Sequence, residues 1–324
     1  MRTTLPLALI LLASSTLTAA PSELPPLGGQ DGVSYAVALS PDSKRMASGG
    51  KDGTVILWDV EGRYELLRLT EHTGPILCLA FSPSGDFVVS GSADRTVRFW
   101  DVQTGKEKRE VIKAHDEAVT AVAINRDASL IATAGWDGKV KLWDNKGEAA
   151  GQHELHKGPV FSLAFAPNGE LLASGGRDQT VHIWNIKDKK EAGSLKDNKR
   201  TVWALAFLPD SKTLAIGAGK VVADNVVIIP VIRLREVGAK TEKASWPGHS
   251  AAIRSLSIGN DGKSIASASD DGTVRIWSLD GKGQPQVIET GAGIVSSVAL
   301  SGDGKTVVAA TADPVRSVRM WTVK

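Results

Sequence analysis

The amino-acid sequence predicts an all-β fold built from repeats. Residues 72–102 contain three short strand candidates separated by turns, and a tryptophan lies at the end of the third. This tryptophan recurs in six places, 41 to 44 residues apart except across one double gap. The six are Trp58, Trp100, Trp143, Trp184, Trp277 and Trp321. One such unit cannot bury both of its faces alone, so a fixed period of this length indicates repeats that cover one another.

Each element of the unit has a local reason in the sequence. The apolar run 76–82 ends at a Pro-Ser-Gly turn, and the apolar run 87–91 gives a second strand candidate. Residues 92–95 form a polar turn, and residues 96–100 alternate between apolar and polar side chains. The pattern therefore predicts consecutive antiparallel strands joined by short turns.

The double gap between Trp184 and Trp277 contains one more unit and an insertion. Residues 232–237 align with residues 97–102, which places Arg235 where the tryptophan is expected. Seven units then cover roughly residues 22–324. The period and the Trp-Asp pairs at residues 58–59, 100–101 and 143–144 resemble those of the WD-repeat family of β-propellers. The resemblance implies a seven-bladed β-propeller of four-stranded antiparallel blades.

The resemblance also implies how the ring closes. The sequence reaches residue 324 directly after the third strand of the last unit, so the outer strand of that blade must come from elsewhere. Residues 22–27 are expected to supply it. Pro25 and Pro26 make this segment a poor strand, which is tolerated only at an outer edge.

The first twenty residues differ from the rest of the chain. Arg2 precedes an apolar run at residues 5–13 and a small, polar stretch at 14–20, the pattern of a secretory signal peptide cleaved after Ala19 or Ala20. A disordered apolar leader is the alternative. The propeller would then comprise residues 21–324, exported to the periplasm, the cell surface or the medium, and a monomer is expected.

Composition and motifs narrow the class of partner. Lys and Arg number 38 against 36 Asp and Glu, a balance that predicts neither nucleic acid nor an anionic membrane as a partner. After residue 20 no segment approaches transmembrane length, so membrane insertion is not expected. The single cysteine, Cys78, excludes a thiolate metal cage. His153 and His156 are three residues apart, but His153 is expected on a solvated outer strand, so no metal and no cofactor are predicted.

A second repeated set consists of histidine, serine or threonine, aspartate and tryptophan. A Ser-His-Asp set would suit a hydrolase, but catalysis needs one exposed nucleophile beside an oxyanion hole rather than copies around a ring. The family resemblance implies a buried network in which aspartate accepts from histidine, and the hydroxyl links histidine to the tryptophan N–H. The residues are His72, Ser90, Asp94, Trp100, His115, Thr133, Asp137, Trp143, His156, Ser174, Asp178, Trp184, His249, Ser267, Asp271 and Trp277.

Three units depart from this pattern. The first has Gln30 in place of the histidine, and the seventh has Gly291 and Ala309 at the histidine and serine positions. The fifth has Asn198, Ile216 and Arg235 at the histidine, serine and tryptophan positions, and its residues 217–230 are expanded. The favoured interpretation is a drifted blade whose inserted residues lengthen its strands. The alternative is an insertion that reaches over one face and contacts a partner.

Function has to be sought at surface positions, because the fold hosts many activities. The resemblance implies that one narrow face carries the residues flanking the start of each first strand and the residue before each turn aspartate. Aromatic and charged side chains at these positions are the predicted partner-binding residues, since such side chains dominate interface energetics. They are Tyr35, Lys51, Trp136, Phe161, Arg177, Trp203, Arg254 and Asp270.

Two functions follow from these residues. The first is a non-enzymatic scaffold that binds a peptide segment or protein surface on this face. The second is a propeller enzyme or small-molecule binder that uses the central channel, which would need a convergent acid–base or metal cluster that the sequence does not contain. The sequence therefore predicts a scaffold, although Phe161 and Trp203 could instead only pack around the channel.

Overall fold

The structure is a computed structural model that describes residues 21–25, 27, 30–109, 112–196, 200–219, 221–223, 226–228, 230–259 and 261–323. The proposed leader, residues 1–20, lies outside the described residues, as do Pro26 and Asn198. Within these ranges every regular element is a β-strand. None of the described residues belongs to a helix long and apolar enough to cross a membrane.

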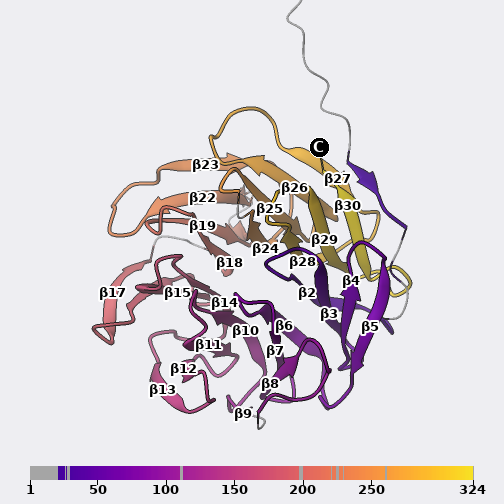
Figure 1. Cartoon of the computed structure of the whole chain (residues 1–324). Coiled ribbons are helices and arrows are strands. Elements are labelled where there is room, and N and C mark those ends of the chain that lie inside the picture. The colour runs from indigo at the N-terminus through magenta and orange to yellow at the C-terminus, as the bar shows by residue number, and fades with distance from the viewer. Residues whose placement is uncertain are drawn as a thin grey trace, which may run out of the picture.

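Seven four-stranded antiparallel sheets are arranged as blades around a centre, which confirms the predicted seven-bladed propeller (Figure 1). Blade 1 consists of β2 (Ser34–Leu39), β3 (Arg45–Gly50), β4 (Val55–Asp59) and β5 (Tyr64–Leu69). Blade 2 consists of β6 (Ile76–Phe81), β7 (Phe87–Ser92), β8 (Thr96–Asp101) and β9 (Ile112–Lys113). Blade 3 consists of β10 (Val119–Ile124), β11 (Leu130–Gly135), β12 (Val140–Asp144) and β13 (Ala149–His153). Blade 4 consists of β14 (Val160–Phe165), β15 (Leu171–Gly176), β16 (Val181–Asn185) and β17 (Lys190–Leu195).

The remaining three blades follow the same order from the inner to the outer strand. Blade 5 consists of β18 (Val202–Phe207), β19 (Thr213–Ala218), β22 (Val231–Glu236) and β23 (Ala244–Pro247). Blade 6 consists of β24 (Ile253–Ile258), β25 (Ser264–Ser269), β26 (Thr273–Ser278) and β27 (Gln286–Glu289). Blade 7 consists of β28 (Val295–Leu300), β29 (Thr306–Thr311), β30 (Val318–Thr322) and β1 (Ser22–Glu23).

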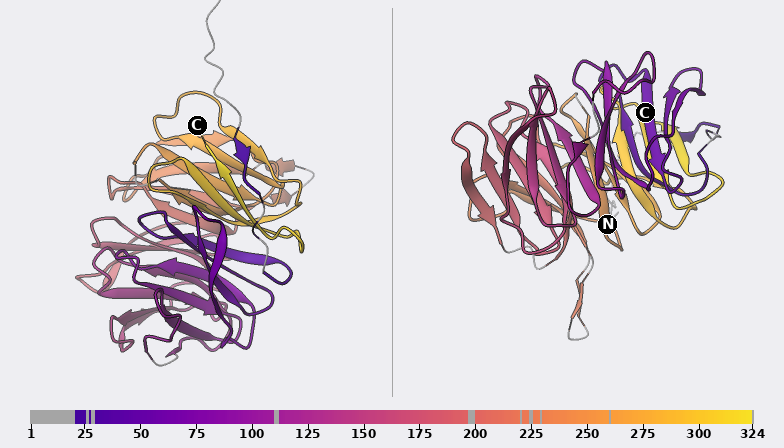
Figure 2. Two further views of the ribbon diagram at one scale, coloured as in Figure 1. Left: turned by 45° about the vertical axis from the view of Figure 1, so that its right-hand side comes forward. Right: turned by 90° about the horizontal axis from the view of Figure 1, so that it is seen from below.

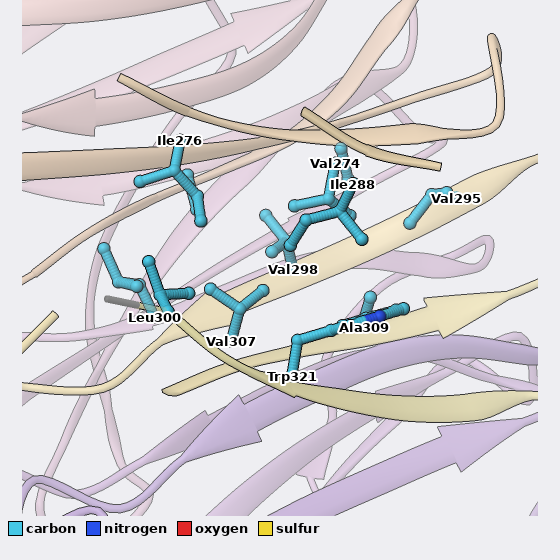
Figure 3. Packing of buried hydrophobic residues seen from close by; sticks show 12 residues of the cluster. Val274, Ile276, Ile288, Val295, Val298, Leu300, Val307, Ala309 and Trp321 are labelled. Carbon is cyan, nitrogen blue, oxygen red and sulfur yellow. The ribbon is translucent and has the colours of Figure 1, made fainter. Parts of the chain in front are cut away.

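The apolar core lies between neighbouring blades. Its buried residues fall into clusters that each join one blade to the next, including the pair formed by blades 7 and 1. Figure 3 shows the cluster between blades 6 and 7, where Ile276 and Ile288 face Val298, Val307 and Trp321. Each blade thus buries its second face against the following blade, as the repeat pattern requires.

The two ends of the propeller meet in blade 7, where the indigo β1 lies beside the yellow β30 (Figure 1). Glu23 is opposite Trp321, and the Leu24 N–H donates to the Met320 carbonyl at 2.9 Å. The strand covers only Ser22–Glu23 of the expected residues 22–27, because Pro25 has no N–H to continue the ladder. Leu27, 5% exposed, then packs into the core between blades 7 and 1.

The insertion in blade 5 forms a hairpin of its own. β20 (Val221–Ala223) pairs with β21 (Val226–Ile228) between β19 and β22. The interpretation that the inserted residues lengthen the blade strands is wrong, since β19 and β22 keep the six residues typical of this propeller. In the right-hand view of Figure 2 the hairpin extends away from the disc of blades. If β19 and β22 were longer, their added residues would lie beyond the ends of the neighbouring blades. The inserted residues pair with each other instead.

Candidate functional site

A β-bulge at the start of each inner strand aims one side chain per blade toward the channel mouth. In blades 4, 5 and 6 the register skips Phe161, Trp203 and Arg254, so these residues have no partner across the ladder. Tyr35 occupies the same position in blade 1. A bulge bends the strand and redirects the extra side chain. This local geometry gives the physical reason for four of the predicted binding residues to face the same opening.

Five of the predicted residues form one continuous row across blades 3 to 6. The rings of Trp136 and Phe161 meet edge to face at 6.2 Å, and those of Phe161 and Trp203 stack at 4.2 Å. The Arg254 guanidinium lies over the Trp203 ring at 4.0 Å. Arg254 in turn donates from Nε and Nη2 to the two carboxylate oxygens of Asp270 at 2.7 and 2.6 Å. We call these five residues the aromatic–arginine row.

The loops behind this row hold it in place through one repeated backbone bond. The Trp136 N–H donates to the Ala118 carbonyl at 3.0 Å, and the Asp270 N–H donates to the Ala252 carbonyl at 2.9 Å. These bonds tie the turn after each second strand to the loop before each first strand. Both predicted groups of surface positions therefore lie on the same face.

The turn residues that make this repeated bond form a ring around the face, and Gly219 is the member of the ring that sequence reasoning missed. Its N–H donates to the Thr201 carbonyl at 3.0 Å, the bond that Trp136 and Asp270 make in their own blades. A Cβ atom at Gly219 would lie 3.2 Å from Nε1 of Trp203, so the glycine lets the indole lie close to the backbone. The hairpin of β20 and β21 begins just after Gly219, and it therefore leaves the propeller on the face that carries the row.

The other three predicted binding residues lie on the same face but outside the row. Tyr35 is the bulge residue of blade 1, and the N–H groups of Lys51 and Arg177 donate to the Val33 and Pro159 carbonyls at 2.9 and 2.8 Å. Tyr35 and Lys51 belong to blade 1, and Arg177 is an exposed turn residue of blade 4. Over the described ranges, none of the three makes a ring contact or an ion pair with a residue of the row. Their part in binding stays a prediction.

The structure contains the repeated histidine network in blades 2, 3 and 6. In blade 2, His72 Nδ1 donates to Asp94 at 2.8 Å, the Ser90 hydroxyl donates to His72 Nε2 at 2.7 Å, and Trp100 Nε1 donates to Ser90 at 2.8 Å. His72 is 6% exposed and Ser90 is fully buried, so the set has no access to a substrate. The equivalent bonds connect His115, Thr133, Asp137 and Trp143, and His249, Ser267, Asp271 and Trp277.

Gln30 replaces the histidine in blade 1 without loss of a bond. Its Nε2 donates to Asp52 at 2.7 Å, and its Oε1 accepts from Ser48 at 2.9 Å. Trp58 Nε1 donates to Ser48 at 2.8 Å, as in the histidine blades. A carboxamide supplies one donor and one acceptor at about the spacing of the imidazole nitrogens, so blade 1 keeps the network.

Blade 4 departs from the predicted network. His156 contacts Asp178 at 3.1 Å and Ser174 at 2.8 Å, but the structure shows no hydrogen bond between Trp184 and Ser174 within the described part of the chain. The Trp184 ring instead stacks on His153 at 4.7 Å. The bond is absent among the described residues because the Trp184 indole packs against the ring of His153 from blade 3.

His153 is buried rather than solvated, which corrects the expectation from the sequence. It is 6% exposed, and both of its ring nitrogens are buried without a hydrogen-bond partner among the described residues. Burial, followed by the nearby His156 and His182, lowers the pKa of His153 to about 4. For Asp178, burial acts to raise the pKa, but the bonds from His156 and the Lys157 N–H outweigh it and bring that pKa to about 2.

Replacing His153 with leucine is expected to make folding less sensitive to acid. Leu69 and Leu195 occupy the equivalent register position in blades 1 and 4, so the site accepts leucine. The folded pKa of His153 lies below its unfolded value, so its contribution is complete above about pH 6.5 and is lost as the pH falls toward 4. The wild type should lose up to about 3 kcal/mol more than His153→Leu over this range.

Urea unfolding at pH 7, 5.5 and 4, with a chelator present, measures this difference. His249→Gln is the matched control. It also removes a buried histidine, but one whose two ring nitrogens are hydrogen-bonded to Asp271 and Ser267 in the wild type. Equal acid sensitivity of the wild type and His153→Leu would contradict the assignment of His153 as a buried neutral imidazole.

The inner strands enclose a central channel of about 1000 Å³. Its described lining consists of apolar and small polar side chains, with Arg126 and Arg254 as the charged groups and neither carboxylate nor imidazole. Cys78 borders it, and burial raises the pKa of that thiol to about 12, so it is not a reactive thiolate. The described lining residues therefore include no acid–base pair of the kind that the channel-enzyme hypothesis requires.

Comparison with known proteins agrees with this architecture. The family model described as the IFT122 first beta-propeller matches residues 20–218, and that of the WD domain, G-beta repeat, matches residues 240–278. The chain is 30% identical over 171 residues to the small ribosomal subunit protein RACK1 of Drosophila melanogaster, covering 51% of this chain and 52% of that protein. It is 26% identical over 256 residues to the 77 kDa echinoderm microtubule-associated protein of Strongylocentrotus purpuratus, covering 78% and 36%.

A third relative is the WD repeat-containing protein SL1-17 of Schistosoma mansoni, 27% identical over 172 residues that make up 52% of this chain and 54% of that protein. The chain thus spans about half or less of the length of these curated relatives. The propeller model nevertheless matches more than half of the chain, and the structure has the seven blades that the repeats predict. The chain belongs to the WD-repeat β-propeller family.

Proposed function

We propose that this protein is a non-enzymatic scaffold that binds a peptide segment or a protein surface on the propeller face carrying the aromatic–arginine row. The observation behind the proposal is the continuity of the row across four consecutive blades. Trp136, at one end of it, is 48% exposed although its blade already has Trp143 as the network tryptophan. An exposed indole at the end of a stacked row serves no evident purpose in folding and suits a binding surface.

The electrostatics of the row favour a polypeptide partner. Asp270 occupies Nε and Nη2 of Arg254, which balances its charge and fixes the guanidinium over the Trp203 ring. Nη1 makes no hydrogen bond within the described part of the chain, so it can donate to a carbonyl or carboxylate of a partner. The rings beside it offer a flat apolar surface. A preorganised aromatic surface with one fixed donor loses little conformational entropy on binding.

Trp136→Ala is expected to reduce capture of the partner about tenfold or more while leaving the thermal unfolding midpoint within about 2 °C of the wild type. Alanine already occupies this ring position as Ala93 in blade 2 and Ala312 in blade 7, so the fold accepts it. The capture is done with immobilised protein and the exported fraction of the source cells, because residues 1–20 predict export.

Tyr64→Ala is the matched control for an exposed aromatic residue outside the row. Tyr64 is 56% exposed and lies on the outer strand β5 of blade 1. Capture that is unchanged in Trp136→Ala, or equally reduced in Tyr64→Ala, would contradict the placement of the binding surface.

A further inference from the structure

Blade 4 gathers more titratable side chains than its repeat position requires. His156 and Asp178 belong to the network, and the sequence adds His182 on β16, Glu191 on β17 and His153 on the adjoining β13 of blade 3. The rings of His156 and His182 meet edge to face at 4.6 Å. Ligand atoms of His156, Asp178 and His182 lie within 4.8 Å of one another. We call these five residues the blade 4 histidine cluster.

His182 is oriented as a metal ligand would be. Its Nδ1 lies 2.7 Å from a Glu191 carboxylate oxygen and donates to it, so the lone pair is on Nε2. Its side chain is 9% exposed, whereas that of Glu191 is 36% exposed. A carboxylate behind one ring nitrogen is the arrangement by which proteins fix the tautomer and the direction of a metal-binding histidine.

The pair of His156 and Asp178 already has the spacing of two ligands of one ion. His156 Nδ1 lies 3.1 Å from each carboxylate oxygen, and donors around tetrahedral zinc are separated by about 3.3 Å. A metal ion can take the place of the shared proton, after which His156 Nε2 carries the hydrogen and donates to Ser174, 2.8 Å away. Ser174 is free to accept it, because among the described residues no tryptophan donates to Ser174 as Trp100 does to Ser90.

His153 adds an independent sign of an incomplete site. Both of its ring nitrogens are buried without a hydrogen-bond partner in the described part of the chain, which is rare for a polar group 6% exposed. Its ring stacks at 4.7 Å on Trp184, which lies two residues from His182 on β16. The carboxylates of Asp178 and Glu191 place two acidic groups beside these imidazoles, a donor set of the kind that binds a divalent cation.

We propose that the blade 4 histidine cluster binds one zinc ion through His156 Nδ1, the Asp178 carboxylate and His182 Nε2, with His153 as the fourth ligand. The ligand atoms of His156, Asp178 and His182 lie within 4.8 Å of one another and must approach to about 3.3 Å around the ion. The site joins blade 3 to blade 4 and has no open position. It is therefore a structural site and lies outside the aromatic–arginine row.

Zinc titration of the purified, untagged chain after chelator treatment tests the proposal. A chromogenic chelator in competition should report one Zn²⁺ per chain with micromolar affinity or tighter, and the thermal midpoint should rise by about 3 °C or more at saturating Zn²⁺. Co²⁺ in place of Zn²⁺ should give the visible absorption of a tetrahedral site with nitrogen and oxygen ligands. Absence of stoichiometric Zn²⁺ binding overturns the proposal.

A matched pair of variants separates this site from nonspecific binding to buried histidines. His156→Gln and His249→Gln make the same change in the same network position, and Gln30 shows that the fold accepts glutamine there. Only His156→Gln should weaken Zn²⁺ binding, by about 100-fold or more. Equal affinity of the two variants overturns the assignment.

His182→Lys provides a second test, with a substitution that the propeller already accepts at this position in another blade. Lys141 has the same register position in blade 3, where it lies opposite Thr133 as His182 lies opposite Ser174. His182→Lys should fold, lose Zn²⁺ binding and lose the Co²⁺ spectrum. A spectrum that persists in His182→Lys excludes His182 as a ligand and overturns the proposed set.

Discussion

Removal of residues 21–27 is expected to lower the free energy of unfolding by about 5 kcal/mol or more, enough to open or unfold the propeller. Leu27 is 5% exposed and fills the core between blades 7 and 1, so its loss leaves a cavity. Arg319 is 7% exposed and donates to Glu23 at 2.7 Å, so the deletion leaves a buried guanidinium without this carboxylate. The edge of β30 also loses its backbone partner.

Urea unfolding of chains that begin at residue 21 and at residue 28 measures this effect. Ser22→Ala is the control within the segment, because Ser22 is exposed and should change the unfolding free energy by less than about 0.5 kcal/mol. A synthetic peptide of residues 21–27 should restore the stability of the shortened chain, since it supplies the deleted residues and can pair with β30 in the same register. Equal stability of the two chains would show that β1 does not close the ring.

Replacement of Trp203 with alanine is expected to weaken partner binding by about 100-fold, equivalent to about 3 kcal/mol. The indole lies between the Phe161 ring at 4.2 Å and the Arg254 guanidinium at 4.0 Å. Its removal frees both neighbours to move, so the row loses its shape as well as one ring. Trp203→Phe keeps a ring in the stack and should recover most of the affinity.

Trp246→Ala is the control that separates binding from stability. Trp246 is also a half-buried tryptophan of blade 5, but it lies on the outer strand β23 and stacks on Trp277 at 6.0 Å. Both alanine variants remove a stacked indole, and only Trp203→Ala should reduce the affinity for the captured partner in a titration. If Trp246→Ala reduces it as much, the loss follows from weakened folding and the row is not the binding surface.

The sequence was sufficient to predict the blades because their strands follow a strict period with a fixed tryptophan. The drifted unit was placed by its alignment alone, and Arg235 indeed lies opposite Leu214 as Trp100 lies opposite Val88. Its guanidinium donates to the carbonyls of Ala239 and Lys240, which explains how a cation can replace an indole there.

What the sequence did not reveal depends on contacts between blades or on backbone geometry. His153 is the last residue of the polar outer strand β13 and was expected in solvent, but Trp184 of the next blade covers it. Gly219 is inconspicuous in the sequence, and only the bond to Thr201 identifies it as part of the ring that supports Trp203. Phe161, Trp203 and Arg254 were predicted on one face, but their distances depend on bulges that no local sequence signal marks.

The closure of blade 7 also has a consequence for folding kinetics. Glu23 and Arg319 are 296 residues apart in the chain, so their ion pair forms only after the intervening chain has been organised. Loop closure over such a separation is slow, and until it occurs the edge of β30 is an open template for another strand. The β1 strand of a second copy presents the same residues to that edge. At high protein concentration, refolding should therefore yield some dimers in which two chains exchange their first strands.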